Sequence, residues 1–225
     1  MSMQRIIDLS QPLYDGAPGA TMFPPPSIKL LKNQPKDGFN LELIHLTTHT
    51  GTHIDAPYHF FPRGKSIDKY SLEELSGPSV VVNLTAKLSL EPITVDDLKQ
   101  REQSILPGYI VLLDTGWGEK RSPKNPEYFN SPYLTEDGAQ WLVDKRIKGV
   151  GIDHFSVSGT DYELSVPPHL VLLANDIWIA EDLYFPSVML EDRDWYVMAI
   201  PLLLEACSGA PARVFAFEIN ENAAT

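Results

Sequence analysis

The residues best suited to chemistry in this chain of 225 residues lie in one short segment, positions 49–59. The segment holds three histidines and one aspartate: His49, His53, Asp55 and His59. Imidazole and carboxylate donors without a thiolate suit Zn²⁺, Mn²⁺ or Fe²⁺. Three protein ligands leave a coordination position for water, which the ion acidifies towards neutral pH. The spacing therefore predicts a metal-dependent enzyme, with His49, His53 and Asp55 as ligands and His59 placed to carry a proton.

These ligands can meet only if the chain bends between them. Side chains alternate along an extended chain, so the odd-numbered positions of the segment share one face. Four residues of strand span roughly 13 Å, however, which is too far for His49 and His53 to bind one ion at about 2 Å each. Glycine, proline and several threonines disfavour a helix here. We expect a kinked strand bent at Gly51 and Pro57, because glycine accepts positive φ and proline fixes φ.

The other histidines are His45, His154 and His169. A single histidine is more often a hydrogen-bonded structural group than a ligand. Four histidines within 15 residues, grouped around glycine and proline, argue against that interpretation for the segment. His45 differs from its neighbours because it lies on the strand expected at 41–46, and we expect it to pack rather than to bind a metal.

Composition and charge exclude several classes of function. The chain has 18 basic and 30 acidic residues and a net charge of −12, which repels nucleic acids and anionic membrane surfaces. No apolar run approaches the roughly 20 residues of a membrane-spanning helix, and the N-terminus lacks the apolar core of a secretory signal, so a cytoplasmic protein is expected. Cys207 is the only cysteine, which rules out an internal disulfide and a thiolate zinc site, and we expect it to be a small buried residue.

Short secondary-structure signals alternate along the chain. β-branched and apolar runs predict strands at 41–46, 80–84, 109–113, 148–153 and 214–217. A helix is expected to begin after Thr94, with Asp97 three residues on, and another to cover 135–143. With 43% hydrophobic residues, this pattern predicts a mixed, strand-rich α/β protein forming one domain over residues 1–225.

The histidine segment resembles the motif His-x-Gly-Thr-His-x-Asp-x-Pro-x-His of the cyclase family of metal-dependent hydrolases, which includes kynurenine formamidase and isatin hydrolase. Every fixed position of that motif is present. A second family signature, a histidine followed twelve residues later by a glutamate, matches His169 and Glu181. Residues 167–174 predict a short helix and 177–181 a strand, and a helix that folds back into a strand can return Glu181 to His169.

The resemblance implies more than the residues alone establish. By resemblance, His49, His53 and Asp55 bind one metal, Asp55 bridges to a second site completed by His169 and Glu181, and His59 is the general acid/base. It implies a swivelling β/β/α fold, a homodimer or homotetramer, one or two Zn²⁺ or Mn²⁺ ions per subunit, and a small-molecule substrate with an amide, lactam or lactone bond.

Two segments depart from the family pattern. Kynurenine formamidases place a tryptophan in the N-terminal loop, where it stacks on the substrate. In this chain the loop reads Ala-Thr-Met-Phe-Pro over 20–24, so we expect Phe23 to serve as the aromatic wall. The stretch 117–132, rich in proline and charge, resembles an insertion and is a second candidate for a substrate loop. Both departures leave the particular substrate open.

Three alternatives accompany this interpretation. A His53/Asp55/His169 triad has the outline of a non-haem iron oxygenase site, but it leaves the other candidate ligands without a role. A non-catalytic binding module stabilised by metal would need a closed coordination shell. A serine hydrolase would need a Gly-x-Ser-x-Gly turn, and the sequence has none.

Overall fold

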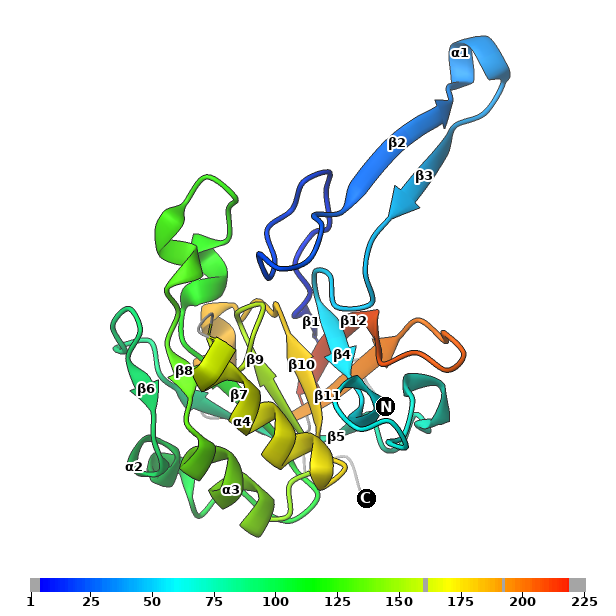
Figure 1. The fold of residues 1–225 in the computed structure, drawn as a ribbon. Helices are drawn as coiled ribbons and strands as arrows, with labels where there is room; N and C mark the ends of the chain where they lie inside the picture. Colours follow the sequence, from blue (N-terminus) through cyan, green and yellow to red (C-terminus); the bar gives the residue numbers. More distant parts are fainter. Residues whose placement is uncertain (1–4, 160–161, 192, 219–225) are drawn as a thin grey trace.

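A strongly twisted sheet that closes on itself organises the structure, a computed structural model that describes residues 5–159, 162–191 and 193–218 (Figure 1). Within these residues, seven strands follow one another around the sheet: β4 (His53–Asp55), β10 (Trp178–Glu181), β9 (Gly149–Ile152), β7 (Ile110–Asp114), β5 (Ser76–Asn83), β11 (Trp195–Pro201) and β12 (Gly209–Glu218). The sheet closes because β12 pairs with β11 along one edge and with β4 along the other. β1 (Ile6–Asp8) pairs with the same edge of β12 as β4 does, farther along the strand.

The parallel strands β5, β7 and β9 are buried on both faces. They therefore read as continuous apolar runs rather than as alternating patterns. Val81 and Leu112 point into the barrel, where they join one core, while Val80 and Leu113 point outward into a second core. The outer core is covered by α3 (Glu136–Asp144) and α4 (Tyr162–Ala174), which pack against each other.

Short elements complete the body of the protein. α2 (Val95–Leu98) begins with the expected capping box between Thr94 and Asp97, and α3 begins at the Thr135 cap. β6 (Pro92–Ile93) and β8 (Tyr133–Leu134) form a parallel pair. The 3₁₀ helices are Pro57–His59, Ile67–Lys69, Lys99–Arg101, Trp117–Lys120, Pro126–Phe129 and Ser187–Leu190. Among the described residues, no helix combines the length and apolar character needed to cross a bilayer.

A two-stranded arm projects from the barrel (Figure 1). It consists of β2 (Ser27–Lys32), the single turn α1 (Gln34–Asp37) and β3 (Leu41–His45). All five residues of β3 are exposed, including His45. The expectation that His45 packs is therefore wrong, because the strand that carries it lies on the arm and not against the core.

Most other expectations for the fold are confirmed. The predicted strands correspond to β3, β5, β7, β9 and β12, and the mixed, strand-rich class is correct. α4 is longer than the predicted helix 167–174: it begins at Tyr162, so that Pro167 and Pro168 lie inside it. The sequence favoured a start at Pro167 because proline suits the first turn of a helix, where its missing N–H is harmless. Cys207 is half-buried against the barrel core rather than fully buried.

Candidate metal centre

The predicted kink in the histidine segment is present. Gly51 has φ of 65°, a left-handed conformation that glycine adopts without strain, and β4 begins only two residues later. The Gly51 carbonyl accepts a hydrogen bond from His53 Nδ1 at 2.8 Å. At the other end, Pro57 opens the 3₁₀ helix that carries His59. The two bending residues therefore set the directions of the segment's imidazoles.

The barrel register brings Glu181 to this segment. β10 runs antiparallel to β4, and Glu181 lies directly opposite His53. Side chains directly opposite each other on neighbouring strands are in contact range. Glu181 Oε2 lies 3.4 Å from His53 Nε2, while Oε1 lies 3.1 Å from His169 Nε2 at the end of the α4–β10 turn-back. The predicted return of Glu181 to His169 is confirmed as geometry.

Asp55 occupies the centre of the group. Its Oδ1 lies 2.7 Å from His49 Nδ1 and 3.2 Å from His53 Nε2. Its Oδ2 points the other way and lies 3.7 Å from His169 Nε2. The side chain is 1% exposed. A carboxylate with one oxygen towards His49 and His53 and the other towards His169 has the geometry that a bridging ligand requires.

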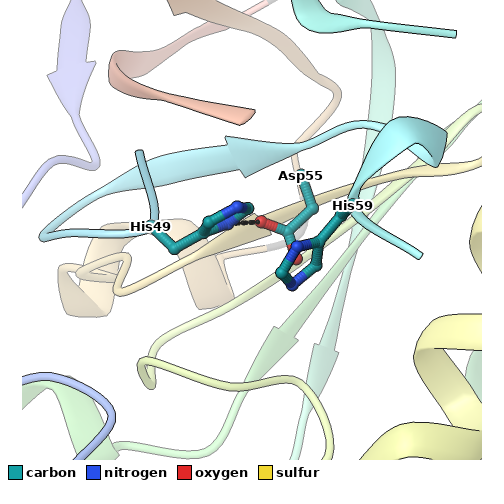
Figure 2. Close-up of side chains that lie close together, drawn as sticks. All are labelled: His49, Asp55 and His59. Carbon is teal, nitrogen blue, oxygen red and sulfur yellow. Dashed lines mark hydrogen bonds and ion pairs between the residues drawn. The ribbon is translucent and has the colours of Figure 1, made fainter. Parts of the chain in front are cut away.

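His59 completes the group from the 3₁₀ helix that follows β4. Its ring stacks on His49 with 3.9 Å between centroids, and Figure 2 shows both imidazoles close to the Asp55 carboxylate. Two sets of potential ligand atoms emerge, each with its atoms within 4.8 Å of one another: His49, Asp55 and His59, and His53, Asp55 and Glu181. All six residues singled out from the sequence, His169 included, therefore converge on one place.

Electrostatics keep both carboxylates charged. Burial alone would raise the pKa of Asp55, but the neighbouring His49 and His53 hold that pKa well below its ordinary value. Burial opposes the charged form of His53, yet its hydrogen bonds with Asp55 and Glu181 raise its pKa well above the ordinary value. Burial also tends to raise the pKa of Glu181, as does Asp55, but hydrogen bonds from the histidines lower it overall.

The donor set fits a divalent cation. Two buried carboxylates are paired with imidazoles, and neither takes part in an ion pair with lysine or arginine anywhere in the described residues. Protons on the imidazoles balance the negative charge, and a cation would replace them. Loss of the Nε2 proton to a cation would leave His53 in the tautomer that ligation requires, because Nδ1 donates to the Gly51 carbonyl and Nε2 faces Asp55 and Glu181.

Two residues of the site were missed from the sequence. Ser208 Oγ lies 2.9 Å from His49 Nε2, so this bond directs His49 Nδ1 towards Asp55. Gly209 lies opposite Asp55 on β12, and a Cβ there would lie 2.5 Å from the Ile54 carbonyl oxygen and 2.8 Å from His49 Cε1. No local motif surrounds either residue, so only the β12–β4 register reveals them.

A cavity of about 290 Å³ opens onto these groups. Its size is near the lower end for small-molecule sites. The histidines and carboxylates described above line it, and four phenylalanines, Phe23, Phe60, Phe129 and Phe155, are among its other lining residues. The ring centroid of Phe23, in the N-terminal loop, lies 6.3 Å from that of His49. Phe129 and Asn130, from the stretch 117–132, line the same cavity together with Phe155. Both segments that depart from the family pattern therefore reach the cavity.

The chain is similar to known proteins in sequence and in fold. The Cyclase family model matches residues 7–158. The chain is 31% identical over 217 residues to kynurenine formamidase of Bacillus anthracis, covering 95% of this chain and 97% of that protein. Isatin hydrolase A from Ralstonia solanacearum has a similar structure, with a TM-score of 0.82, 25% identity and coverage of 94% and 91% of the two chains. A structure described as a potential metal-dependent hydrolase with cyclase activity has a TM-score of 0.77 at 29% identity, covering 97% of this chain and all of that one.

A closed strand-rich barrel with an external histidine–carboxylate site defines a class of metal-dependent hydrolase. The chain belongs to the Cyclase family, and the resemblance read from its histidine motif is confirmed. The iron oxygenase alternative is not favoured. Its triad would leave Glu181 unused, although this carboxylate contacts both His53 and His169.

Proposed function

We propose that the protein is a metal-dependent amidohydrolase that cleaves the C–N bond of an aryl amide or of a lactam fused to an aromatic ring. The convergence of six ionisable groups below an aromatic cavity carries this proposal. His49, His53 and Asp55 would hold one ion, and Asp55, His169 and Glu181 a second. Zn²⁺ and Mn²⁺ both suit these donors. When bound, the metal polarises the substrate carbonyl and acidifies water.

His59 is the proposed general acid/base. Burial is the main cause that lowers the pKa of His59 to about 4, although Asp55 opposes this shift. The imidazole is therefore neutral near pH 7 and can accept the proton of the attacking water. It can then pass that proton to the leaving amine. Stacking on His49 holds the ring beside the ligands without using its nitrogens.

The cavity walls favour a flat aromatic substrate. Phe23 and Phe129 come from separate segments, and Phe60 adds a third ring beside His59 at 4.5 Å between centroids. Aromatic rings pack well against one another in offset or edge-on arrangements. The relatives named above act, by their names, on kynurenine-type formamides and on isatin, which are both aromatic amides.

The deciding experiment joins metal analysis to a substrate panel. Purified protein should contain Zn²⁺ or Mn²⁺ and hydrolyse formanilides or isatins faster than aliphatic lactones and cyclic imides, without O₂. His59→Ala should keep the metal and lose about 10²–10⁴-fold in kcat. Full activity after metal removal would refute the proposal. Loss of fold in His59→Ala, with no turnover by the wild type, would favour a structural metal instead.

We also propose that two copies associate through the arm. Seven large apolar side chains between Leu30 and Leu46 are each 37–58% exposed: Leu30, Leu31, Phe39, Leu41, Leu43, Ile44 and Leu46. A two-stranded hairpin is marginally stable alone in water, so this one needs a covering surface. A pair of arms would bury on the order of 1,000–1,500 Å², the size of a specific interface. The arm carries three lysines against two acidic residues, so it adds little to the repulsion between two copies that each have a net charge of −12.

The mass in solution tests this association. Light scattering should give at least twice the 25.2 kDa of one chain. The double variant Leu43→Asp/Ile44→Asp should give a single chain, while Leu88→Asp, at a more exposed position off the arm, should leave the mass unchanged. A monomeric wild type would refute an arm-mediated dimer.

A further inference from the structure

The two segments that depart from the family pattern form one unit. Trp117, Tyr128 and Phe155 make a small buried cluster, separate from the two large cores, and Ala20 and Phe129 pack against it. We call these five residues the aromatic wall. Ala20, Phe129 and Phe155 also line the cavity. The N-terminal loop and the stretch 117–132 therefore meet as a single wall over the metal centre rather than as two independent loops.

One buried carboxylate anchors this wall. Asp182 receives hydrogen bonds from Arg121 Nε at 2.8 Å and from the Tyr128 hydroxyl at 2.8 Å. Arg121 Nη2 lies 2.8 Å from the second oxygen of the carboxylate, and the two side chains are only 3% and 1% exposed. Tyr128 belongs to the wall itself, while Arg121 also donates to the Pro12 carbonyl, near the N-terminal loop. The stretch 117–132 is thus tied directly to this acidic group, and Arg121 links it to the chain that leads into the N-terminal loop.

Asp182 directly follows the candidate ligand Glu181. Its backbone has φ of 55°, which is uncommon for a residue with a side chain. The chain turns here, so that Glu181 faces the metal centre and Asp182 faces the wall. Two hydrogen bonds to the Asp182 backbone hold this turn without the carboxylate. The Asp182 N–H donates to the His154 carbonyl, and the Asp182 carbonyl accepts from the Thr52 hydroxyl, both at 2.6 Å.

We propose that the Asp182 carboxylate, with Arg121 and Tyr128, is a positioning group that fixes the aromatic wall over the metal centre and so sets the width of the substrate site. The role of the wall in substrate choice rests on the proposed function, but the attachment of the wall does not. The backbone contacts of Asp182 hold Glu181, and its side chain holds the wall. A buried ion pair that loses one partner leaves the other charge uncompensated. Neutralising Asp182 would leave the Arg121 charge buried, so it displaces the stretch 117–132 rather than the candidate ligand Glu181.

Asp182→Asn and Tyr128→Phe test this division of roles, since both keep the shape of the side chain. The matched control is Glu127→Gln, which breaks the exposed Lys120–Glu127 pair on the same loop. For the two test variants, KM for a formanilide should rise about 10-fold, KM for a bulkier naphthyl formamide should rise less than 2-fold, and kcat should change little. The metal Kd should stay within 2-fold of wild type. The control should match wild type throughout.

Limited proteolysis tests the attachment independently of any substrate. Trypsin should cut after Lys124 at least 5-fold faster in Asp182→Asn and Tyr128→Phe than in wild type or Glu127→Gln, at a temperature where all four are folded. Unchanged cleavage would overturn the proposal. So would a weaker metal affinity accompanied by an equal rise in KM for every substrate. If the wild type hydrolyses no aryl amide, the proposed function fails, while the proteolysis result still decides whether Asp182 holds the wall.

Discussion

Gly209 gives the sharpest test of how the barrel builds the metal centre. A Cβ at this position would lie 2.5 Å from the Ile54 carbonyl oxygen and 2.8 Å from His49 Cε1. Ordinary contacts between such atoms are about 3.5 Å or longer, so Gly209→Ala demands a shift of about 1 Å. Either β12 moves away from β4 or the His49 ring turns away from Asp55.

Overpacking of this kind costs about 1–3 kcal/mol, which for a chain of this size lowers Tm by roughly 2–10 °C. Displacing a ligand from its hydrogen-bonded orientation typically weakens metal affinity about 10–100-fold. We therefore expect Gly209→Ala to bind Zn²⁺ or Mn²⁺ at least about 10-fold more weakly, by calorimetric titration of metal-free protein.

Gly19→Ala is the matched control, since a Cβ at Gly19 meets no atom within 4 Å and the residue does not have positive φ. It should leave both Tm and metal Kd at their wild-type values. Wild-type affinity and stability in Gly209→Ala would show that β12 and β4 are not packed as described, and the reasoning from register to ligand orientation would be wrong.

Three further predictions concern charge and metal. Burial, followed by the Asp153 charge, raises the pKa of Asp114 to about 7, so the stability from its protonated form is present below about pH 4 and lost as pH rises through 7. In urea denaturation, the free energy of unfolding of Asp114→Asn should exceed that of wild type by about 2–4 kcal/mol at pH 8 and match it at pH 4. An equal gain at both pH values would contradict the raised pKa of Asp114. Chelation should lower Tm, and metal at about 100 times its Kd should restore about 2.7 kcal/mol, so an unchanged melting curve would argue against a metal in the folded state. Ser208→Ala should weaken metal binding about 10–100-fold in the same titration while Ser208→Thr retains it, and equal affinities would show that Ser208 does not orient His49.

The candidate site could be predicted from the sequence where its chemistry is local. His49, His53, Asp55 and His59 lie within one bend, and Gly51 supplies a φ that few other residues adopt. A local bend leaves a pattern of residue types, so type and spacing are enough to find it. The return of Glu181 to His169 came from the family resemblance, supported by a helix and a strand in succession, which can reverse the chain.

What depends on strand register could not be predicted. Ser208 and Gly209 reach His49 only because β12 pairs with β4, more than 150 positions away in sequence. A shift of one residue would turn every side chain of β12 to the other face, and nothing in the local sequence fixes that choice. The exposure of His45 was missed for a related reason: an apolar strand on a projecting arm has the same composition as one in the core.

The closure of the barrel has a consequence for how the protein is made. The three strands β4, β10 and β12 meet at the metal centre, but they leave the ribosome far apart in time, since they begin at His53, Trp178 and Gly209. The histidine segment must therefore wait through the synthesis of most of the chain before its partners exist. A growing chain could not hold the proposed ion in its final geometry, so loading with metal would come after β12 has been synthesised.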